Sequence, residues 1–406
     1  MALEPLSAAA CPTIETGAGE FRNDAFSFWK PPEHLRARLE VSTLASEVLA
    51  NWYLLEQYLP QRARRPPRGM SIYYALKQGI PLWLRHGINA LVIKTRRRGS
   101  FPHWPYETAL IDLRQSWLEQ SAAQNGAAQW HIGFWPEGKS CCIVLTHDVE
   151  SPIGFARMER MADLEERYGF RSSWNLPLAQ YPLDWRLIAR LESRGFEFGA
   201  HGLSHDGKLF RSYEDFSRLA PQLEIRSREH NLRGFRSPST LRRAEWIQLL
   251  DFDYDCSFAD TDPFEPQPGG TCSVFPFFLG AMIELPYTLP QDHTMIHLLH
   301  RDPLPVWVAK VQWLASIGGM ILTLIHPDYC GAPPYLHSYE ELLRHLAALQ
   351  SAWRALPSQV AAWWRQRAGM QLTMADGIPR IVSDANGYAS VARLNYPPAA
   401  AQKAAQ

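Results

Sequence analysis

The chain has 406 residues and carries 41 Lys and Arg against 41 Asp and Glu, which gives a formal net charge of zero. That balance gives the whole protein no electrostatic preference for nucleic acid or for an anionic membrane surface. Hydrophobic residues make up 46% of the chain and charged residues 20%, as in ordinary globular proteins with a substantial core. The composition therefore predicts a globular protein that does not have nucleic acid as a partner.

Hydropathy and cysteine usage indicate the compartment. No stretch reaches the roughly 20 apolar residues needed to span a bilayer, because the best candidate, residues 80–93, contains Arg85 and His86. The N-terminus lacks the basic start and the apolar core of a secretory signal. The six cysteines form no Cys-x-x-Cys pair, and the adjacent Cys141 and Cys142 belong to opposite faces of a predicted strand. We therefore expect a cytoplasmic protein with reduced thiols and no transmembrane segment.

The first third of the sequence differs from the rest. Residues 1–24 are rich in Ala, Pro and Gly and are predicted to be disordered. Residues 25–139 are predicted to form a mainly helical extension, since apolar residues recur at helical spacing between residues 32 and 58. Two basic clusters, residues 61–68 and 94–98, lie in this extension. Such clusters usually form a solvated face, but they leave open a phosphate-bearing substrate or peripheral contact with an anionic lipid surface.

From residue 140 the pattern changes to alternating strands and helices. Strand patterns occupy residues 141–145, 170–176, 197–200, 252–257 and 320–325, and helical patterns include residues 155–168, 184–193, 213–230, 242–250, 307–317 and 339–356. Strict alternation favours a parallel sheet with outer helices, and right-handed crossovers bring the carboxyl ends of the strands to one face. We predict an α/β domain over residues 140–368, followed by a small β appendage and a disordered tail over residues 369–406.

The first of these strands runs into Thr146-His147-Asp148-Val149-Glu150. Side chains alternate along a strand, so Asp148 and Glu150 should share one side while His147 and Val149 point to the other. Two carboxylates at the end of a buried strand are costly unless something pairs with them. We therefore expect Asp148 and Glu150 to reach a polar site, and we interpret His147 as structural.

A histidine pair supplies partners for these carboxylates. His201 and His205 directly follow the strand pattern of residues 197–200. Two imidazoles four residues apart can meet one metal ion, and a carboxylate from a neighbouring strand end completes a three-ligand set with positions left for water. Paired carboxylates and a lone His-x3-His are each more often structural or accidental. Their common place at the carboxyl ends of successive strands, where α/β folds carry their chemistry, nevertheless predicts a metal site of His201, His205 and one of the two carboxylates.

Two more polar motifs follow later strands. Gly234-Phe235-Arg236-Ser237-Pro238 places an arginine at a strand end, and residues 320–325 run into His326-Pro327-Asp328. Taken in order, the four motifs resemble those of the polysaccharide deacetylases of the NodB-homology fold, which are metal-dependent carbohydrate esterases and amidases. That family has a Thr-Phe-Asp-Asp strand end, a His-x3-His, an Arg-x-Pro and a late Leu-x-His. The resemblance covers residues 141–367 and implies a distorted or incomplete (β/α) barrel.

The sequence departs from the family pattern at two positions. The second aspartate of the family, a metal ligand, falls on Val149, so that ligand must come from Glu150 or be missing. Strand parity favours Glu150, because residues i and i+2 share a face. The tyrosine that commonly follows Arg-x-Pro is replaced by Ser239, which leaves open one contact that the family makes to the substrate's carbonyl.

The resemblance also implies a division of catalytic roles. Asp148 would act as general base, Arg236 would hold Asp148 ionised and oriented, and His326 would protonate the departing amine. A neighbouring acid, Asp255 or Asp260, could tune the pKa of His326. The cofactor would be a divalent metal ion, with zinc expected first and cobalt, nickel or iron(II) as alternatives, since two imidazoles and one carboxylate suit them all.

Four other residues are predicted to contact the substrate because they lie on, or just beyond, segments that lead to the same rim. They are Trp174, Pro238, Asp255 and His293.

The expected function is hydrolysis of an N-acyl group, acetyl in the first instance, from an amino-sugar-containing saccharide or an activated sugar intermediate. Two alternatives stay open. One is a hydrolase of a small non-sugar amide or cyclic imide on the same fold. The other is a metal-free, non-catalytic saccharide-binding relative, with Val149 as the sign of a lost ligand. The sequence indicates no oligomeric state.

Overall fold

The computed structural model describes residues 23–32, 40–61, 63–64, 101–125, 130–333, 335–383 and 387–393. The disorder predicted for residues 1–24 lies outside these ranges except at residues 23 and 24, and the tail predicted after residue 396 lies outside them too, as do most residues of the two basic clusters. Within the described ranges, no helix combines the length and the apolar character needed to cross a membrane.

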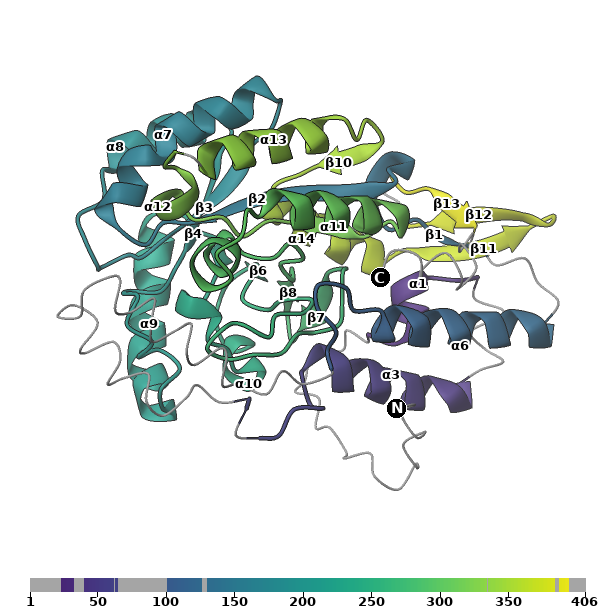
Figure 1. The fold of residues 1–406 in the computed structure, drawn as a ribbon. Coiled ribbons are helices and arrows are strands. Elements are labelled where there is room, and N and C mark those ends of the chain that lie inside the picture. Colours follow the sequence, from purple (N-terminus) through teal and green to yellow (C-terminus); the bar gives the residue numbers. More distant parts are fainter. Residues whose placement is uncertain are drawn as a thin grey trace.

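A curled sheet of nine strands forms the centre of the molecule (Figure 1). Eight strands follow the path β10-β2-β3-β4-β5-β6-β8-β7, and β9 pairs with β2 outside that path. All pairs are parallel except β7 with β8. The strands are β2 (Cys141–Asp148), β3 (Ser172–Leu176), β4 (Glu197–Ala200), β5 (Gly234–Phe235), β6 (Tyr254–Asp255), β7 (Phe277–Leu279), β8 (Met282–Glu284), β9 (Met320–Leu322) and β10 (Ala352–Arg354).

The segment that follows β8 closes the curled sheet by meeting β9. The backbone N–H groups of Thr288 and Leu289 both donate to the carbonyl of Leu322, at 3.0 and 3.1 Å. The Thr288 hydroxyl donates to the Met320 carbonyl at 2.8 Å and accepts from the Leu322 N–H at 2.9 Å. These bonds join the segment after β8 to β9 irregularly, so the architecture is the distorted (β/α) barrel that the sequence predicted.

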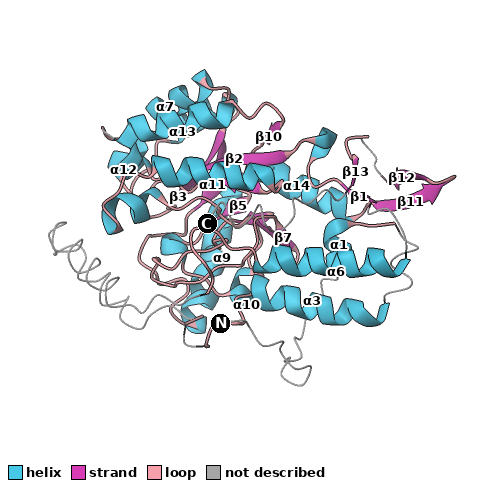
Figure 2. Cartoon of the chain, turned by 45° about the vertical axis from the view of Figure 1, so that its right-hand side comes forward, coloured by secondary structure: helices cyan, strands magenta, loops and turns pink. Residues whose placement is uncertain are grey.

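Helices cover the outside of the sheet (Figure 2). They are α7 (Pro152–Arg167), α8 (Trp185–Ser193), α9 (Tyr213–Glu229), α10 (Ala244–Ile247), α11 (Leu304–Ser316), α12 (Pro327–Cys330), α13 (Tyr335–Ala347) and α14 (Pro357–Ala368). Local chemistry sets where they begin, because the side chains of Ser151, Asp184 and Ser212 accept hydrogen bonds from the first N–H groups of α7, α8 and α9.

Two predicted helices are shorter than the sequence pattern suggested. The pattern over residues 339–356 predicted one helix, but α13 ends at Ala347 and the chain returns as strand β10. Pairing explains the change, because β10 is hydrogen-bonded in register with Cys141–Ile143 of β2, and that tertiary contact outweighs helix propensity. The helix predicted over residues 242–250 is the single turn of α10.

The N-terminal residues contribute α1 (Ala25–Trp29), α3 (Glu40–Leu54), α6 (Ala109–Asn125) and β1 (Trp130–Ile132). Helices α3 and α6 lie side by side in both views (Figures 1 and 2). Phe28 of α1 packs 5.1 Å from Phe275 and 6.0 Å from Trp364, measured between ring centroids, so this part shares the apolar core of the barrel. At the other end of the chain, β11 (Gln371–Ala375) pairs with β12 (Ile378–Val382), and β13 (Val391–Arg393) pairs with β1. The division of the chain into domains stays a proposal.

Candidate metal-dependent active site

The carboxyl end of β2 presents both carboxylates to the histidine pair. Asp148 Oδ2 lies 3.8 Å from His201 Nε2, and Glu150 Oε1 lies 2.8 Å from His205 Nε2. Val149, between the two acids, is fully buried and faces the interior. The period of two along the strand thus accounts for the shared direction of Asp148 and Glu150.

Glu150, His201 and His205 form a compact group of potential metal ligands. One donor atom of each residue lies within 4.8 Å of the others. His201 follows β4, and the chain turns at Gly202, whose φ is +73° and where a Cβ would come within 2.9 Å of Pro238 Cγ. Glycine therefore lets the chain turn between the two histidines while Pro238 stays in close contact.

The protonation of His201 suits a metal ligand. His201 Nδ1 lies 3.0 Å from the Arg236 carbonyl, which can only accept, so Nδ1 carries the proton and Nε2 carries the lone pair. Burial lowers the pKa of His201 to about 4, which keeps the ring neutral at neutral pH. Its Nε2 atom is buried and has no hydrogen-bond partner among the described residues. A buried lone pair directed at a carboxylate and a second imidazole fits a divalent metal ion.

Three residues that the sequence analysis missed fix the position of Glu150. Its backbone N–H donates to Asp328 Oδ2 at 3.1 Å, and the Tyr329 hydroxyl donates to its Oε2 at 3.2 Å. The Gln180 side chain donates to the Glu150 carbonyl at 2.7 Å and accepts from the His205 N–H. Asp328 and Tyr329 lie two and three positions after His326 in the sequence, so their position was a usable signal.

Asp148 is held ionised next to this group. Arg236 Nη1 donates to Asp148 Oδ1 at 3.1 Å, and Asn175 Nδ2 donates to the same oxygen at 2.9 Å. Burial alone would raise the pKa of Asp148, but the charge of Arg236 above all, together with that of His326 and the Asn175 hydrogen bond, outweighs burial and lowers that pKa below its usual value. Asp148 Oδ2, which faces His201, is the oxygen that can receive a proton.

His326 lies beside the potential ligand Glu150, with its Nε2 3.8 Å from Glu150 Oε1. Its Nδ1 lies 2.6 Å from Asp292 Oδ1, and its backbone N–H donates to Asp292 Oδ2 at 2.9 Å. Burial would lower the pKa of His326, but the charge and the hydrogen bond of Asp292 raise it to about 10, so the ring is protonated at neutral pH.

The acid beside His326 is therefore Asp292 rather than either acid that the sequence analysis considered. Asp260 Oδ2 instead pairs with Lys310 Nζ at 2.7 Å in the interior. Asp255 lies opposite Glu284 in the register of β6 and β8, and it accepts a hydrogen bond of 2.5 Å from the Ser257 hydroxyl. Both are thus engaged elsewhere in the fold.

The four predicted substrate contacts fall into two groups. Pro238 and His293 lie at the centre, because Pro238 packs against Gly202 and the His293 ring centroid lies 6.4 Å from that of His326. Trp174 and Asp255 are fully buried, and their contact with a substrate stays a prediction. The Trp174 ring stacks 4.1 Å from His147, centroid to centroid.

His147 has a structural environment, as expected. Its Nε2 lies 2.6 Å from Glu165 Oε1 of α7, and both side chains are fully buried. It points to the side of the strand opposite Asp148.

The Arg-x-Pro turn has an unusual backbone. Ser239 and Thr240 have φ values of 53° and 47°, although neither is glycine. Two consecutive left-handed residues carry a conformational cost of roughly 1–3 kcal/mol each. Such strain is typical of segments at functional sites, and here it lies where the family that the four motifs resemble has a tyrosine.

Comparisons with known proteins find similar chains among solved structures. No protein-family model and no curated protein matches the chain. A Mycobacterium smegmatis protein assigned as a polysaccharide deacetylase has a similar structure, with 18% identity, a TM-score of 0.47, and coverage of 59% of this chain and 96% of that chain. An assigned polysaccharide deacetylase from Pseudomonas aeruginosa PAO1 is similar at 13% identity and a TM-score of 0.44, over 56% of this chain and 92% of that one. Puue allantoinase is similar at 13% identity and a TM-score of 0.43, over 57% and 92%.

The solved structures similar to this chain therefore include polysaccharide deacetylases, in agreement with the resemblance of the four motifs. At these identities and TM-scores the likeness carries no argument about chemistry. The function has to follow from the arrangement of the chain's own side chains.

Proposed function

We propose that the protein is a metal-dependent hydrolase that removes an N-acyl group, acetyl in the first instance, from an amino-sugar-containing saccharide. The observation that carries this proposal is an acid and a base beside one potential metal site of Glu150, His201 and His205. Asp148 is ionised with Oδ2 3.8 Å from His201 Nε2, and His326 is protonated with Nε2 3.8 Å from Glu150 Oε1.

The three ligands would hold the ion, and the ion would lower the pKa of a bound water and polarise the acyl carbonyl. Asp148 Oδ2 accepts the proton of the attacking water as its oxygen bonds to the carbonyl carbon. Arg236 and Asn175 keep Asp148 in place through Oδ1. As the carbon–nitrogen bond breaks, His326 gives its proton to the departing amine, and Asp292 stabilises the imidazolium before that transfer. The products are a carboxylate and an amine.

The expected cytoplasmic location bears on the saccharide. A cytoplasmic enzyme would not reach a cell-wall polymer, so a nucleotide-linked or lipid-linked N-acyl amino sugar, or a soluble oligosaccharide, is the preferred substrate. Zinc is the first choice of ion on donor chemistry, because two imidazoles and one carboxylate suit it well.

The test is acetate release from a panel of N-acetylated saccharides by purified, metal-supplemented protein. We expect acetate and free amine in equal amounts, activity abolished by a chelator, and no turnover by His205→Ala. Release of product only from small amides or cyclic imides would show that the protein is a non-sugar amide hydrolase instead. Saccharide binding without metal and without turnover would show that it is a metal-free, non-catalytic saccharide-binding protein.

A further inference from the structure

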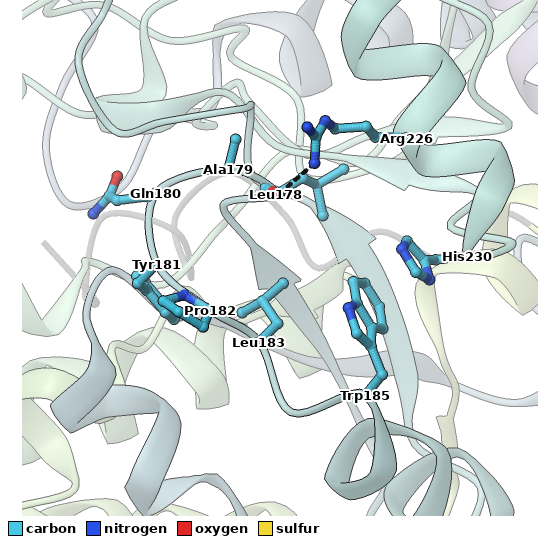
Figure 3. A pocket seen from close by; sticks show the side chains of 9 residues that line it. All are labelled: Leu178, Ala179, Gln180, Tyr181, Pro182, Leu183, Trp185, Arg226 and His230. Atoms are coloured by element: carbon cyan, nitrogen blue, oxygen red, sulfur yellow. Dashed lines mark hydrogen bonds between the residues drawn. The ribbon is translucent and has the colours of Figure 1, made fainter.

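A pocket of about 440 Å³ opens beside the loop that follows β3. Leu178, Tyr181, Pro182, Leu183 and Trp185 supply its apolar walls. The Trp185 and His230 rings stack face to face, with centroids 3.3 Å apart and planes 7° apart, and the Arg226 guanidinium lies against Leu178 (Figure 3). One of its nine lining residues, Gln180, also holds Glu150, but none of the nine is a proposed metal ligand, base or acid.

One stretch of chain, residues 178–181, separates the pocket from the metal-ligand triad. The Leu178 and Ala179 N–H groups donate to the carbonyls of Gly202 and Leu203, at 3.0 and 2.7 Å, which ties this stretch to the turn between the two histidines. Tyr181 donates from its hydroxyl to the Val149 carbonyl at 2.8 Å. A saccharide whose N-acyl unit lies at the triad would therefore bring its neighbouring unit to this pocket.

The polar lining of the pocket is basic. Arg226 and His230 are its two basic side chains, and none of the nine lining residues carries a carboxylate. Arg226 donates from Nη1 to the Leu178 carbonyl at 3.5 Å, which orients the planar guanidinium. An arginine has five N–H donors in all, so this bond uses one of them. The charge of Glu192 on α8 interacts with His230, but Glu192 does not line the pocket. Planar guanidinium donors suit the two oxygens of a carboxylate or phosphate.

Resting on the proposed function, we propose that this pocket binds an anionic group on the sugar unit next to the N-acyl sugar, so that the substrate is an acidic saccharide. The apolar walls pack against the C–H face of that sugar, and Arg226 with His230 binds its anion. A carboxylate of a uronic-type sugar and a phosphate ester share this chemistry.

The test is calorimetric binding to the wild-type protein, Arg226→Gln and Arg228→Gln. Arg228 is the matched control, because it lies on the same helix, is 61% exposed, pairs with Asp251 at 2.8 Å and does not line the pocket. The probes are a glucuronate–N-acetylglucosamine disaccharide, a chitobiose that carries a phosphate ester on one of its two sugar units, and neutral chitobiose. We expect Arg226→Gln to weaken binding of an anionic probe about tenfold or more, as for loss of a charged hydrogen bond, while chitobiose binding is unchanged. The anionic probe that binds Arg226→Gln more weakly than wild type shows whether the pocket recognises a carboxylate or a phosphate.

Equal losses for neutral and anionic probes, or equal affinities for wild type and Arg226→Gln, would overturn the proposal. A deacetylation assay with the same probes separates it from the proposed function. If Arg226→Gln weakens binding of the anionic probes but no acetate is released, the anion-binding pocket is supported and the hydrolase function is rejected. If acetate is released and neither binding nor release depends on Arg226, the hydrolase function is supported and the anion-binding pocket is rejected.

Discussion

Arg236 and Arg242 lie six residues apart, are both fully buried, and both bind a carboxylate. Arg236 binds Asp148, and Asp148 keeps its second oxygen directed at His201. Arg242 donates through Nε to Glu56 Oε2 at 2.8 Å and through Nη2 to Oε1, so both oxygens of Glu56 are taken. The same kind of ion pair therefore belongs to the proposed reactive site in one place and to a closed structural contact in the other.

The surroundings of the second pair show what it holds together. Arg242 Nη1 also donates to the Gln267 carbonyl at 2.9 Å, and the Tyr58 hydroxyl donates to the Gly270 carbonyl at 2.7 Å. The pair thus fastens the end of the N-terminal helical segment onto the loop that contains Gln267 and Gly270. A carboxylate–arginine pair indicates catalysis only if the carboxylate retains an oxygen that faces other reactive groups.

The largest expected effect is that of Asp148→Asn, which removes the proposed base without changing its shape. We expect kcat to fall by roughly 10²- to 10⁴-fold, the usual contribution of a general base. Steady-state kinetics on metal-loaded protein measures it, with metal content as the control. A kcat within threefold of wild type would show that Asp148 is no more reactive than Glu56.

The same chemical change at the other pair, Glu56→Gln, should act on stability instead. Breaking a buried pair leaves Arg242 uncompensated, which costs about 3–5 kcal/mol in the free energy of unfolding. Urea denaturation measures that loss, and kcat of the folded fraction should stay within twofold of wild type. A kcat loss as large as that of Asp148→Asn would erase the distinction between the two regions.

Asp292→Asn should change the pH dependence of the reaction. His326 has to be protonated to act as acid, so activity is present below its pKa and is lost as the pH rises through about 10. Without the charge of Asp292 the pKa of His326 falls, and the alkaline limb of kcat should move to lower pH by more than one unit. The measurement is a rate profile from pH 6 to pH 10.5, and an unmoved limb would remove His326 from the acid role.

The smallest effect belongs to an exposed arginine of the same segment. Arg233 Nε pairs with Asp253 Oδ2 at 2.8 Å, and the two side chains are 64% and 41% exposed. Arg233→Gln should change the free energy of unfolding by less than about 1 kcal/mol and leave kcat unchanged, because exposed pairs are screened by water. A larger loss, measured by the same denaturation experiment, would mean that burial does not explain why the Glu56–Arg242 pair stabilises the protein more than the Arg233–Asp253 pair.

Strand periodicity predicted the parts of the site that depend on one strand. The alternation along β2 gave the common direction of Asp148 and Glu150, and the alternation of strands and helices gave the barrel with its carboxyl ends on one face. The pattern of a single strand does not reveal how neighbouring strands are aligned in register. Asp148 lies opposite Asn175 in the pairing of β2 with β3, so Asn175 reaches Asp148 while Trp174 points to the opposite side.

The partner of His326 depended on an even longer-range contact. Asp292 lies 34 positions away in the sequence and meets His326 because the segment after β8 closes the sheet against β9. No periodic pattern encodes that closure. Asp255 ends a predicted strand and therefore looked like a rim residue, but register places it opposite Glu284 in the interior.

The most direct test of the central claim is the metal content of the purified protein, measured by elemental analysis beside Glu150→Ala and His201→Ala. The geometry predicts close to one divalent ion per wild-type chain and its loss in both variants. Leu249→Ala, a change at an exposed residue, should keep the ion. A wild-type protein that takes up no metal even after reconstitution would contradict the metal-dependent mechanism.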